Sequence, residues 1–283
     1  MYKSKLLLAA LALILGVGLL TGCSAKTDSQ NMTGELTGTI TAAGSTALLP
    51  LLKPAAEEFM KKHPEVTVNI SGGGSVTGQN QVAAGNVDIG NSDVPVVGEL
   101  KDKGLVEYEA AIAPFVLITH PSNTLKNLTR EQAAAIFTGR VTNWKEVGGN
   151  DEKITVIHRA KSSGSRITIK DKVLDGREFT DNAIIQDSNG AVRAAIAGTP
   201  GSLGYVDVPY VDRSVKPLAY DGVEYSLQAV KEGKWPIYAA ARMMTKGPAD
   251  GLTKAFIDYV QSAEFQNNYA EIFGFIPLGQ VKR

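Results

Sequence analysis

Strand-like apolar runs alternate with helix-like segments along most of this chain of 283 residues, and that alternation limits the possible folds more than any other feature. Residues 36–42, 66–70 and 87–90 are strand-like, and residues 47–62 and 76–84 lie between them with helical character. Chains in which strands and helices alternate form α/β folds. The sequence therefore predicts an α/β protein.

The segment 47–62 has the clearest helical pattern. Pro50 is compatible with the opening turn of a helix, and the pair His63-Pro64 is a stop signal. The apolar residues recur three and four positions apart, as on one helix face: Leu48, Leu51, Leu52, Ala55, Ala56 and Phe59.

The first 22 residues have the pattern of a bacterial signal peptide. Two lysines, Lys3 and Lys5, precede an apolar run from Leu6 to Leu20, which is too short to span a membrane comfortably. The sequence Leu-Thr-Gly-Cys that ends at Cys23 resembles a lipobox, which implies cleavage before Cys23 and lipid attachment to it. An ordinary secretory signal followed by an incidental cysteine is the alternative.

Cys23 is the only cysteine, so the chain cannot form an internal disulfide. Residues 23–35 lack apolar periodicity and are predicted to be a flexible tether between lipid and folded protein. Removal of residues 1–22 leaves 283 − 22 = 261 residues, enough for one large or two medium domains. We therefore expect a protein anchored to the outer face of a bacterial cell membrane.

Two apolar stretches are candidates for crossings between two lobes. One is the strand 110–119, which Pro114 interrupts, and the other is 235–245. A buried strand with a proline in its middle is suited to pass from one lobe to another, and two crossings allow hinge closure. The predicted boundaries are 36–113 plus 243–283 for the first lobe and 114–242 for the second.

The charge balance argues against nucleic acid as a partner. The chain has 29 basic and 29 acidic residues, and loss of Lys3 and Lys5 with the signal peptide leaves 27 − 29 = −2. The sequence has no basic stripe interleaved with aromatic residues. An anionic ligand would therefore be held by local groups and not by the field of the whole protein.

Three turns rich in hydroxyl groups and glycine follow predicted strands: Gly44-Ser45-Thr46, Gly74-Ser75 and Ser162–Ser165. Each lies where a helix is expected to begin. A helix N-terminus has unpaired backbone amides and a partial positive charge, so three such turns that meet at one point would bind a small oxyanion. A single turn of this kind can serve only as an N-cap.

The glycine-rich turn at 71–78 does not fit nucleotide or nucleophile motifs. A P-loop needs Gly-Lys-Ser or Gly-Lys-Thr, and neither occurs in the chain. Thr77 also stands where a dinucleotide fingerprint or a hydrolase elbow needs glycine. Ser75 therefore remains as a hydroxyl donor.

Asp93 ends a segment that begins as a buried strand, Val87-Asp88-Ile89-Gly90. The residue can cap a turn. Alternatively it contacts a ligand, and because an ionised aspartate only accepts hydrogen bonds, an oxyanion beside it must carry a proton. Hydrogen phosphate has such a proton at neutral pH and sulfate does not, so Asp93 is a candidate selectivity filter.

Arg159 follows the predicted strand 154–158 and precedes the turn Ser162–Ser165 and a predicted helix at 166–173. A guanidinium matches two oxygens of a tetrahedral anion and keeps its charge. A solvated surface role is the alternative. The three histidines are too scattered for a metal site, and no nucleophile is paired with a general base, so the sequence predicts neither a metal nor an enzyme.

These residues resemble the PstS family, the phosphate-binding lipoproteins of bacterial phosphate ABC importers, over nearly the whole mature chain. The resemblance implies a two-lobed fold of the type II periplasmic-binding-protein kind. The segments that carry it are 44–46, 73–75, 87–93, 136–144 (Ile-Phe-Thr-Gly-Arg-Val-Thr-Asn-Trp), 159–165 and 199–205 (Thr-Pro-Gly-Ser-Leu-Gly-Tyr).

The resemblance also implies a set of phosphate ligands. Two positions depart from the family pattern: Ala47 replaces an aromatic residue of some members, and Lys161 stands where some relatives have an acid near the arginine, so the partner that holds Arg159 is open. The implied ligands are Thr46, the amide of Ala47, Ser75, Asp93, Arg159, Ser163, Gly164 and Ser165.

The resulting expectation is a lipid-anchored, monomeric binding protein that captures inorganic phosphate and passes it to membrane permease subunits, with no cofactor. Segments 142–144 and 188–190 are expected to be structural, as a turn with a packed indole and a helix start. The alternatives are a receptor or a sensor for another oxyanion such as sulfate, tungstate or arsenate, a phosphate sensor without transport, and an extracellular phosphatase.

Overall fold

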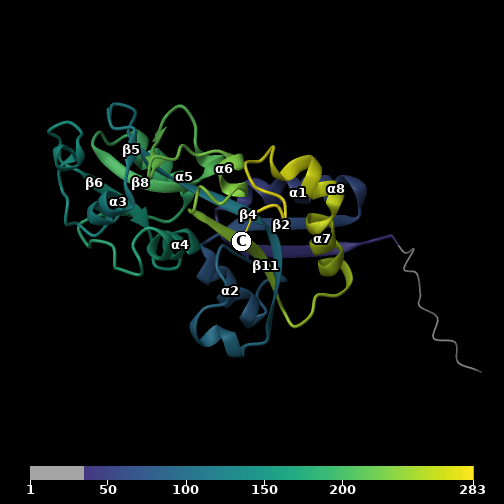
Figure 1. Cartoon of the computed structure of the whole chain (residues 1–283). Helices are drawn as coiled ribbons and strands as arrows, with labels where there is room; N and C mark the ends of the chain where they lie inside the picture. The colour runs from purple at the N-terminus through teal and green to yellow at the C-terminus, as the bar shows by residue number, and fades with distance from the viewer. Residues whose placement is uncertain (1–34, 283) are drawn as a thin grey trace, which may run out of the picture. The chain divides into compact units, whose positions relative to one another are not determined.

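The computed structural model describes residues 35–282 of the chain. Their main feature is a mixed β-sheet (Figure 1). Its strand order is β2-β1-β3-β11-β4-β8-β6-β7, and β9 pairs with β4 off this path. The strands are β1 (Gly38–Gly44), β2 (Val66–Gly72), β3 (Ile89–Ser92), β4 (Leu105–Thr119), β6 (Thr155–Arg159), β7 (Ile184–Gln186), β8 (Ser202–Asp207), β9 (Lys216–Pro217) and β11 (Tyr238–Lys246). A separate pair consists of β5 (Asn127–Leu128) and β10 (Ala219–Tyr220).

Helices connect most of these strands, as the predicted alternation requires. The α-helices are α1 (Leu49–Lys62), α2 (Ser75–Ala84), α3 (Arg130–Phe137), α4 (Gly164–Lys172), α5 (Asn189–Ala197), α6 (Leu227–Lys231), α7 (Gly251–Gln261) and α8 (Ala263–Phe265). Short 3₁₀ turns are η1 (Gly98–Asp102), η2 (Trp144–Val147) and η3 (Val208–Tyr210), and η4 (Gln266–Ala270) is a π-helical turn. None of the helices within 35–282 is long and apolar enough to cross a membrane.

The predicted signal peptide at 1–22, the predicted lipidation of Cys23 and the tether up to residue 34 lie outside the described residues. Within them the predicted α/β class is confirmed, with boundaries shifted by a few residues. The strand predicted at 87–90 is β3, which begins at Ile89 and continues to Ser92. The helix predicted at 166–173 is α4, which begins two residues earlier, at Gly164.

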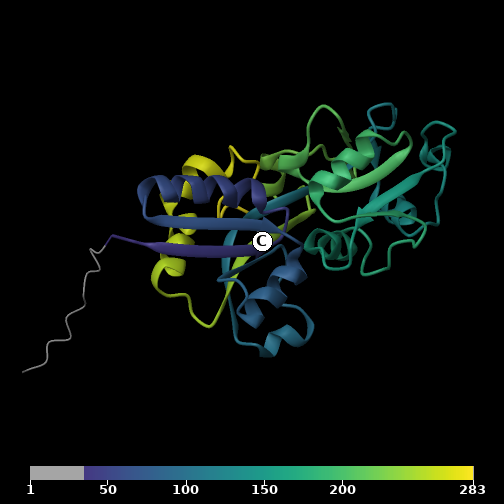
Figure 2. The ribbon, with the colours of Figure 1, turned by 180° about the vertical axis from the view of Figure 1, so that it is seen from behind.

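The first three strands are parallel, in the order β2-β1-β3. The connection from β1 to β2 therefore crosses the sheet in one direction, and the connection from β2 to β3 crosses it in the opposite direction to reach the other side of β1. Because such crossovers are right-handed, α1 and α2 must lie on opposite faces of the sheet. Figures 1 and 2 show α1 on the face that it shares with α7, and α2 on the other face.

The α1 helix buries the apolar stripe expected from its spacing. Phe59 packs edge-on against Phe256 of α7, with ring centroids 5.4 Å apart. The helix ends at Lys62, just before the predicted stop at His63, and the His63 amide donates to the carbonyl of Phe59. A second proline, Pro54, lies inside the helix.

The long strand β4 belongs to both halves of the sheet. From Leu105 to Pro114 it pairs antiparallel with β11, and from Phe115 to Thr119 it pairs antiparallel with β8. The change of partner therefore falls at Pro114. The exact lobe boundaries stay a prediction.

Candidate functional site

Three hydroxyl-bearing turns meet at Asp93. This residue follows β3 and is 3% exposed. One carboxylate oxygen accepts a hydrogen bond from the Ser45 hydroxyl, and the other accepts one from the Ser165 hydroxyl at 3.2 Å. The backbone amide of Asp93 donates to Ser75 Oγ at 3.0 Å. The structure thus brings the turns at 44–46, 74–75 and 162–165 to one carboxylate.

The sheet topology explains this convergence. β1, β2 and β3 are parallel neighbours, so their C-terminal ends lie at one edge, and β6 delivers the third turn from the other half of the sheet. The α2 and α4 helices begin at that edge with Ser75 and Gly164. Ligands of open α/β sheets bind at such an edge, where helix N-termini point unpaired amides at them.

Close backbone approach at Gly164 lets the two halves of the site touch. A Cβ added there would lie 2.9 Å from the Asp93 Cβ and closer still to Ser75 Oγ. The Val76 amide donates to the Ser162 carbonyl at 3.0 Å, which fixes the same approach. Any larger residue at position 164 would therefore push α4 away from Asp93.

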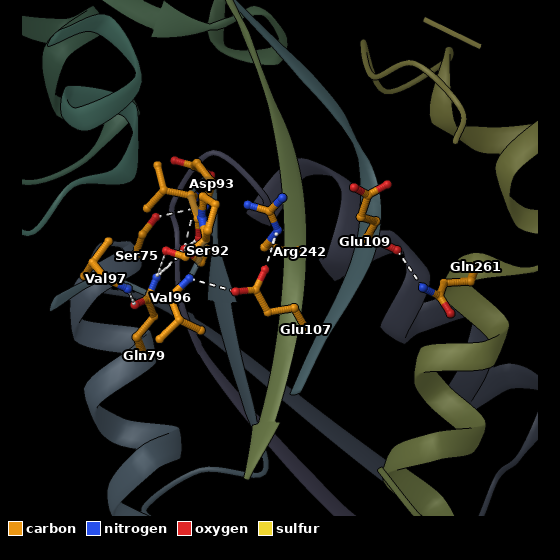
Figure 3. Close-up of polar contacts among 12 residues, drawn as sticks. Ser75, Gln79, Ser92, Asp93, Val96, Val97, Glu107, Glu109, Arg242 and Gln261 are labelled. Carbon is orange, nitrogen blue, oxygen red and sulfur yellow. Dashed lines mark hydrogen bonds and ion pairs between the residues drawn. The ribbon is translucent and has the colours of Figure 1, made fainter. Parts of the chain in front are cut away.

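Side chains of α2 and β4 hold the segment that carries Asp93 (Figure 3). The buried Gln79 amide donates to Ser92 Oγ at 2.9 Å and to the Pro95 carbonyl at 3.1 Å, and its oxygen accepts from the Val97 amide at 3.0 Å. Glu107 accepts from the Val96 amide at 2.8 Å and pairs with Arg242 Nε at 3.1 Å. Both groups orient Asp93 from outside the site.

Arg159, the last residue of β6, is 1% exposed. Its Nε donates to the Gln186 carbonyl at 3.2 Å, and its Nη2 donates to the Asp187 carbonyl at 2.8 Å. Backbone carbonyls therefore hold the guanidinium, in place of the acid that some relatives have at the position of Lys161. Nη1 is buried and has no hydrogen-bond partner within residues 35–282, which leaves its two N–H groups for a ligand.

The predicted ligands at the helix starts already have structural partners. Ser163 caps α4 by accepting from the Arg166 amide at 3.2 Å, and the Ala47 amide donates to Ser45 Oγ at 3.1 Å. Thr46 Oγ1 accepts from the backbone and side-chain nitrogens of Asn189 at 3.3 and 3.2 Å. A hydroxyl that accepts still has its own proton to donate, so capping and ligand binding are compatible at Ser163 and Thr46.

Sequence reasoning did not place several residues of this site. Ser45 was visible in its turn but absent from the predicted ligand set. Segment 188–190 was recognised as a helix start, and Ser188 does cap α5, but the contact of Asn189 with Thr46, 143 positions away, has no local signal. Tyr210, which donates to the Thr46 carbonyl at 2.6 Å, and the buried Asp207 gave none either.

Burial dominates the electrostatics of Asp93. It raises the pKa of this carboxyl above its ordinary value, and the hydrogen bond from Ser45, the charge of Arg159 and the hydrogen bonds from Ser165 and Ser75 offset the shift only in part. Burial likewise lowers the pKa of Arg159 from its usual high value. Among residues 35–282, no group of three or more His, Cys, Asp or Glu side chains is arranged to hold a metal ion.

Residues 29–264 match the family model described as a PBP superfamily domain. The chain is also 39% identical over 293 residues to the phosphate-binding protein PstS of Bacillus subtilis, across 100% of this chain and 97% of that protein. This chain belongs to the PstS family.

Solved structures agree with membership of the PstS family and with its two-lobed fold. A Clostridium perfringens protein, solved with bound phosphate and described as a phosphate ABC transporter substrate-binding protein, is 33% identical with a TM-score of 0.81, over 85% of this chain and 100% of that one. An ABC-type phosphate transport receptor of Vibrio cholerae is 27% identical with a TM-score of 0.69, over 84% and 99%. These relatives are named as binding proteins or receptors.

Proposed function

We propose that the protein captures inorganic phosphate between its two lobes and delivers it to an ABC importer, without breaking a bond in its ligand. The observation that carries this proposal is the buried Asp93 carboxylate among three hydroxyl-bearing turns, with Arg159 as the nearby cation. Membership of the PstS family supports the choice of ligand.

The proposed contacts supply one acceptor and many donors. Hydrogen phosphate would donate its proton to Asp93, and the Ser165 hydroxyl that now donates to Asp93 would turn to a ligand oxygen. The free Nη1 of Arg159 would take another oxygen. The full proposed set is Thr46, the amide of Ala47, Ser75, Asp93, Arg159, Ser163, Gly164 and Ser165.

The same arrangement would reject sulfate. An oxyanion without a proton would leave an unpaired anionic oxygen against the buried Asp93 carboxylate, and sites that need one hydrogen-bonding group discriminate by roughly 10⁴-fold against ligands that lack it. Arsenate carries a proton at neutral pH, as phosphate does, so Asp93 does not separate these two. Pocket size and direct competition would decide between them.

Closure of the two lobes would create the full site, because the proposed ligands come from both. Thr46, Ser75 and Asp93 belong to the proposed first lobe, and Arg159 and Ser163 to the second. A ligand that contacts both sets favours the closed state. The pairing of β11 with β4 from Tyr238 onward supports a second crossing a few residues before the boundary expected at 242.

Isothermal titration with phosphate, arsenate and sulfate tests the ligand assignment. We expect tight binding of phosphate, competition by arsenate and no saturable binding of sulfate. A thermal shift series gives an independent reading, since a ligand of the native state stabilises it by RT ln(1 + [L]/Kd). Equal stabilisation by phosphate and sulfate would refute the assignment.

We also propose that Cys23 anchors the mature protein by lipid to the outer face of the cell membrane. The support is the sequence Leu-Thr-Gly-Cys after the apolar run that ends at Leu20. Cys23→Ser is expected to release the protein from the membrane fraction, whereas the control Ser24→Ala is not. Release of neither variant, or of both, would contradict the anchor.

Delivery to permease subunits, and not phosphate sensing alone, is the third part of the proposal. Deletion of the gene is expected to abolish high-affinity phosphate uptake, and restoration by the wild type but not by a binding-defective variant would tie uptake to the site. Normal uptake in the deletion strain would favour a sensor. The proposed monomeric state is tested by light scattering of the purified protein with and without phosphate.

A further inference from the structure

A second buried carboxyl lies next to the site, on Asp207 at the end of β8. The residue is 0% exposed, and neither of its carboxylate oxygens has a hydrogen-bond partner within residues 35–282. A buried carboxylate without partners is costly, and such a group normally neutralises itself by keeping its proton. The proposed phosphate contacts do not use this group.

Asn189 connects Asp207 to the ligand-binding turn. The Asp207 amide donates to Asn189 Oδ1 at 3.2 Å, and the two nitrogens of Asn189 donate to the hydroxyl of Thr46. Tyr210, three residues after Asp207, donates to the Thr46 carbonyl at 2.6 Å. A charge on Asp207 would therefore lie one residue away from a proposed phosphate ligand.

The groups around Asp207 come from several elements and give it no counter-charge. Asp93, after β3, acts on it with a negative charge. Arg159 in β6 directs two of its donors to backbone carbonyls. The neighbours Tyr210 in η3 and Tyr225 before α6 are phenols. Burial raises the pKa of both, and a negative charge on Asp207 would raise it further.

We propose that Asp207 is held in the closed protein as a neutral carboxylic acid, and that its neutrality keeps a second negative charge away from the bound anion. Asp93 and Asp207 then have opposite assignments: one carboxylate accepts the proton of the ligand, and one carboxylic acid remains uncharged beside it. This inference rests on the proposed function.

The electrostatics of the pair agree with this assignment. Burial, first, and the negative charge of Asp93, second, raise the pKa of Asp207 well above its ordinary value, while the neighbouring Val208 amide opposes the shift. Asp93 differs because the hydroxyls of Ser45 and Ser165 and the charge of Arg159 favour its ionised form. When the surroundings of two carboxyl groups separate their pKa values, one group can stay ionised while the other stays protonated.

Infrared spectroscopy of phosphate-free protein at neutral pH tests the protonation directly, because a protonated carboxyl has a C=O stretch that a carboxylate lacks. We expect this band in the wild type and in Asp93→Asn, and its loss in Asp207→Asn. Asp212→Asn is the matched control, since Asp212 is an exposed aspartate five residues on, paired with Arg193. A band that survives in Asp207→Asn would overturn the proposal. Absence of the band from the wild type, or from Asp93→Asn, would also overturn it.

A pH series then tests whether the charge acts on the ligand. The ratio of phosphate Kd in the wild type to that in Asp207→Asn is expected to rise by about tenfold or more over the alkaline interval in which the band disappears, and to stay constant where the band persists. The ratio for Asp212→Asn should stay flat throughout. Loss of the band without a change in the Asp207→Asn ratio would overturn the proposed effect of Asp207 on phosphate binding. A wild type that binds no phosphate would instead refute the proposed function, and the assignment of the infrared band to Asp207 would still hold.

Discussion

The Ser165 hydroxyl donates a hydrogen bond of 3.2 Å to Asp93 Oδ2, although the two residues are 72 positions apart and lie at the ends of different strand–helix units. This bond joins the start of α4 to the end of β3. It places the donor-rich turn of one half of the sheet against the carboxylate of the other, and the following predictions test what that contact does.

Asp93→Asn is expected to weaken phosphate binding by roughly 10² to 10³-fold and to permit measurable sulfate binding. The substitution replaces an acceptor by an NH₂ donor, so the proton of phosphate loses its partner, a loss of about 3–4 kcal/mol. Titration calorimetry with both anions measures the change. Asp102→Asn, on an exposed aspartate of η1, is the control, and unchanged selectivity in Asp93→Asn would eliminate the filter.

Gly164→Ala is expected to reduce phosphate affinity at least tenfold while the protein still folds. The added Cβ would lie 2.9 Å from the Asp93 Cβ, and overpacking of this kind costs about 1–3 kcal/mol. Gly198→Ala is the matched control, since its Cβ would meet only ordinary contacts near the end of α5. Binding curves that coincide for Gly164→Ala and the wild type would show that close approach at α4 is unimportant.

Gln79→Ala is expected to lower both stability and affinity without removing a proposed ligand. It leaves the amide of Val97 and the carbonyl of Pro95 without their side-chain partner, a cost of about 1–3 kcal/mol. Asn80→Ala on the exposed side of the same helix should change neither property. Urea unfolding and calorimetry supply the two readings, and an affinity unchanged at reduced stability would mean that Gln79 does not orient Asp93.

In phosphate-free buffer, Asp93→Asn is expected to be more stable than the wild type at neutral pH, and the difference should vanish in acid. Burial raises the pKa of Asp93 in the folded protein, whereas the same carboxyl in the unfolded chain has the ordinary aspartate pKa of about 3.9. The folded wild type thus binds more protons in this window, and its free energy of unfolding falls as the pH rises from about 4 through the folded pKa. Thermal melts of both proteins from acid to neutral pH measure the difference. A difference independent of pH would contradict the assigned shift.

Much of the fold follows from local sequence. The spacing of Leu51, Leu52, Ala55 and Phe59 predicts α1, and these residues are buried as expected. Boundaries were less accurate because pairing partners and caps decide them: β3 continues to Ser92 because Asn91 and Ser92 pair with β11, a strand about 150 residues later. No periodicity within the strand itself contains that information.

The candidate site divides in the same way. Ser75, Arg159 and Ser165 could be predicted from the sequence because they lie in turns at strand ends, where hydroxyl residues and glycine at a helix start are typical of caps and anion sites. Asp207 and Tyr210 gave no such signal, since an aspartate that ends β8 and a tyrosine in the following turn η3 are ordinary residues until the tertiary structure places them near Asp93. The carbonyls of Gln186 and Asp187 that hold Arg159 are invisible to any reading of side chains.

The changeover at Pro114 has a consequence for how the two halves of the sheet can flex. A proline has no amide hydrogen, so the ladder loses no donor where β4 leaves β11 and joins β8. The next residue, the buried Phe115, donates its amide to the Ile237 carbonyl at 2.9 Å, so bending there would cost a buried hydrogen bond. We therefore expect β4 to bend most easily at Pro114, where its pairing partner changes from β11 to β8.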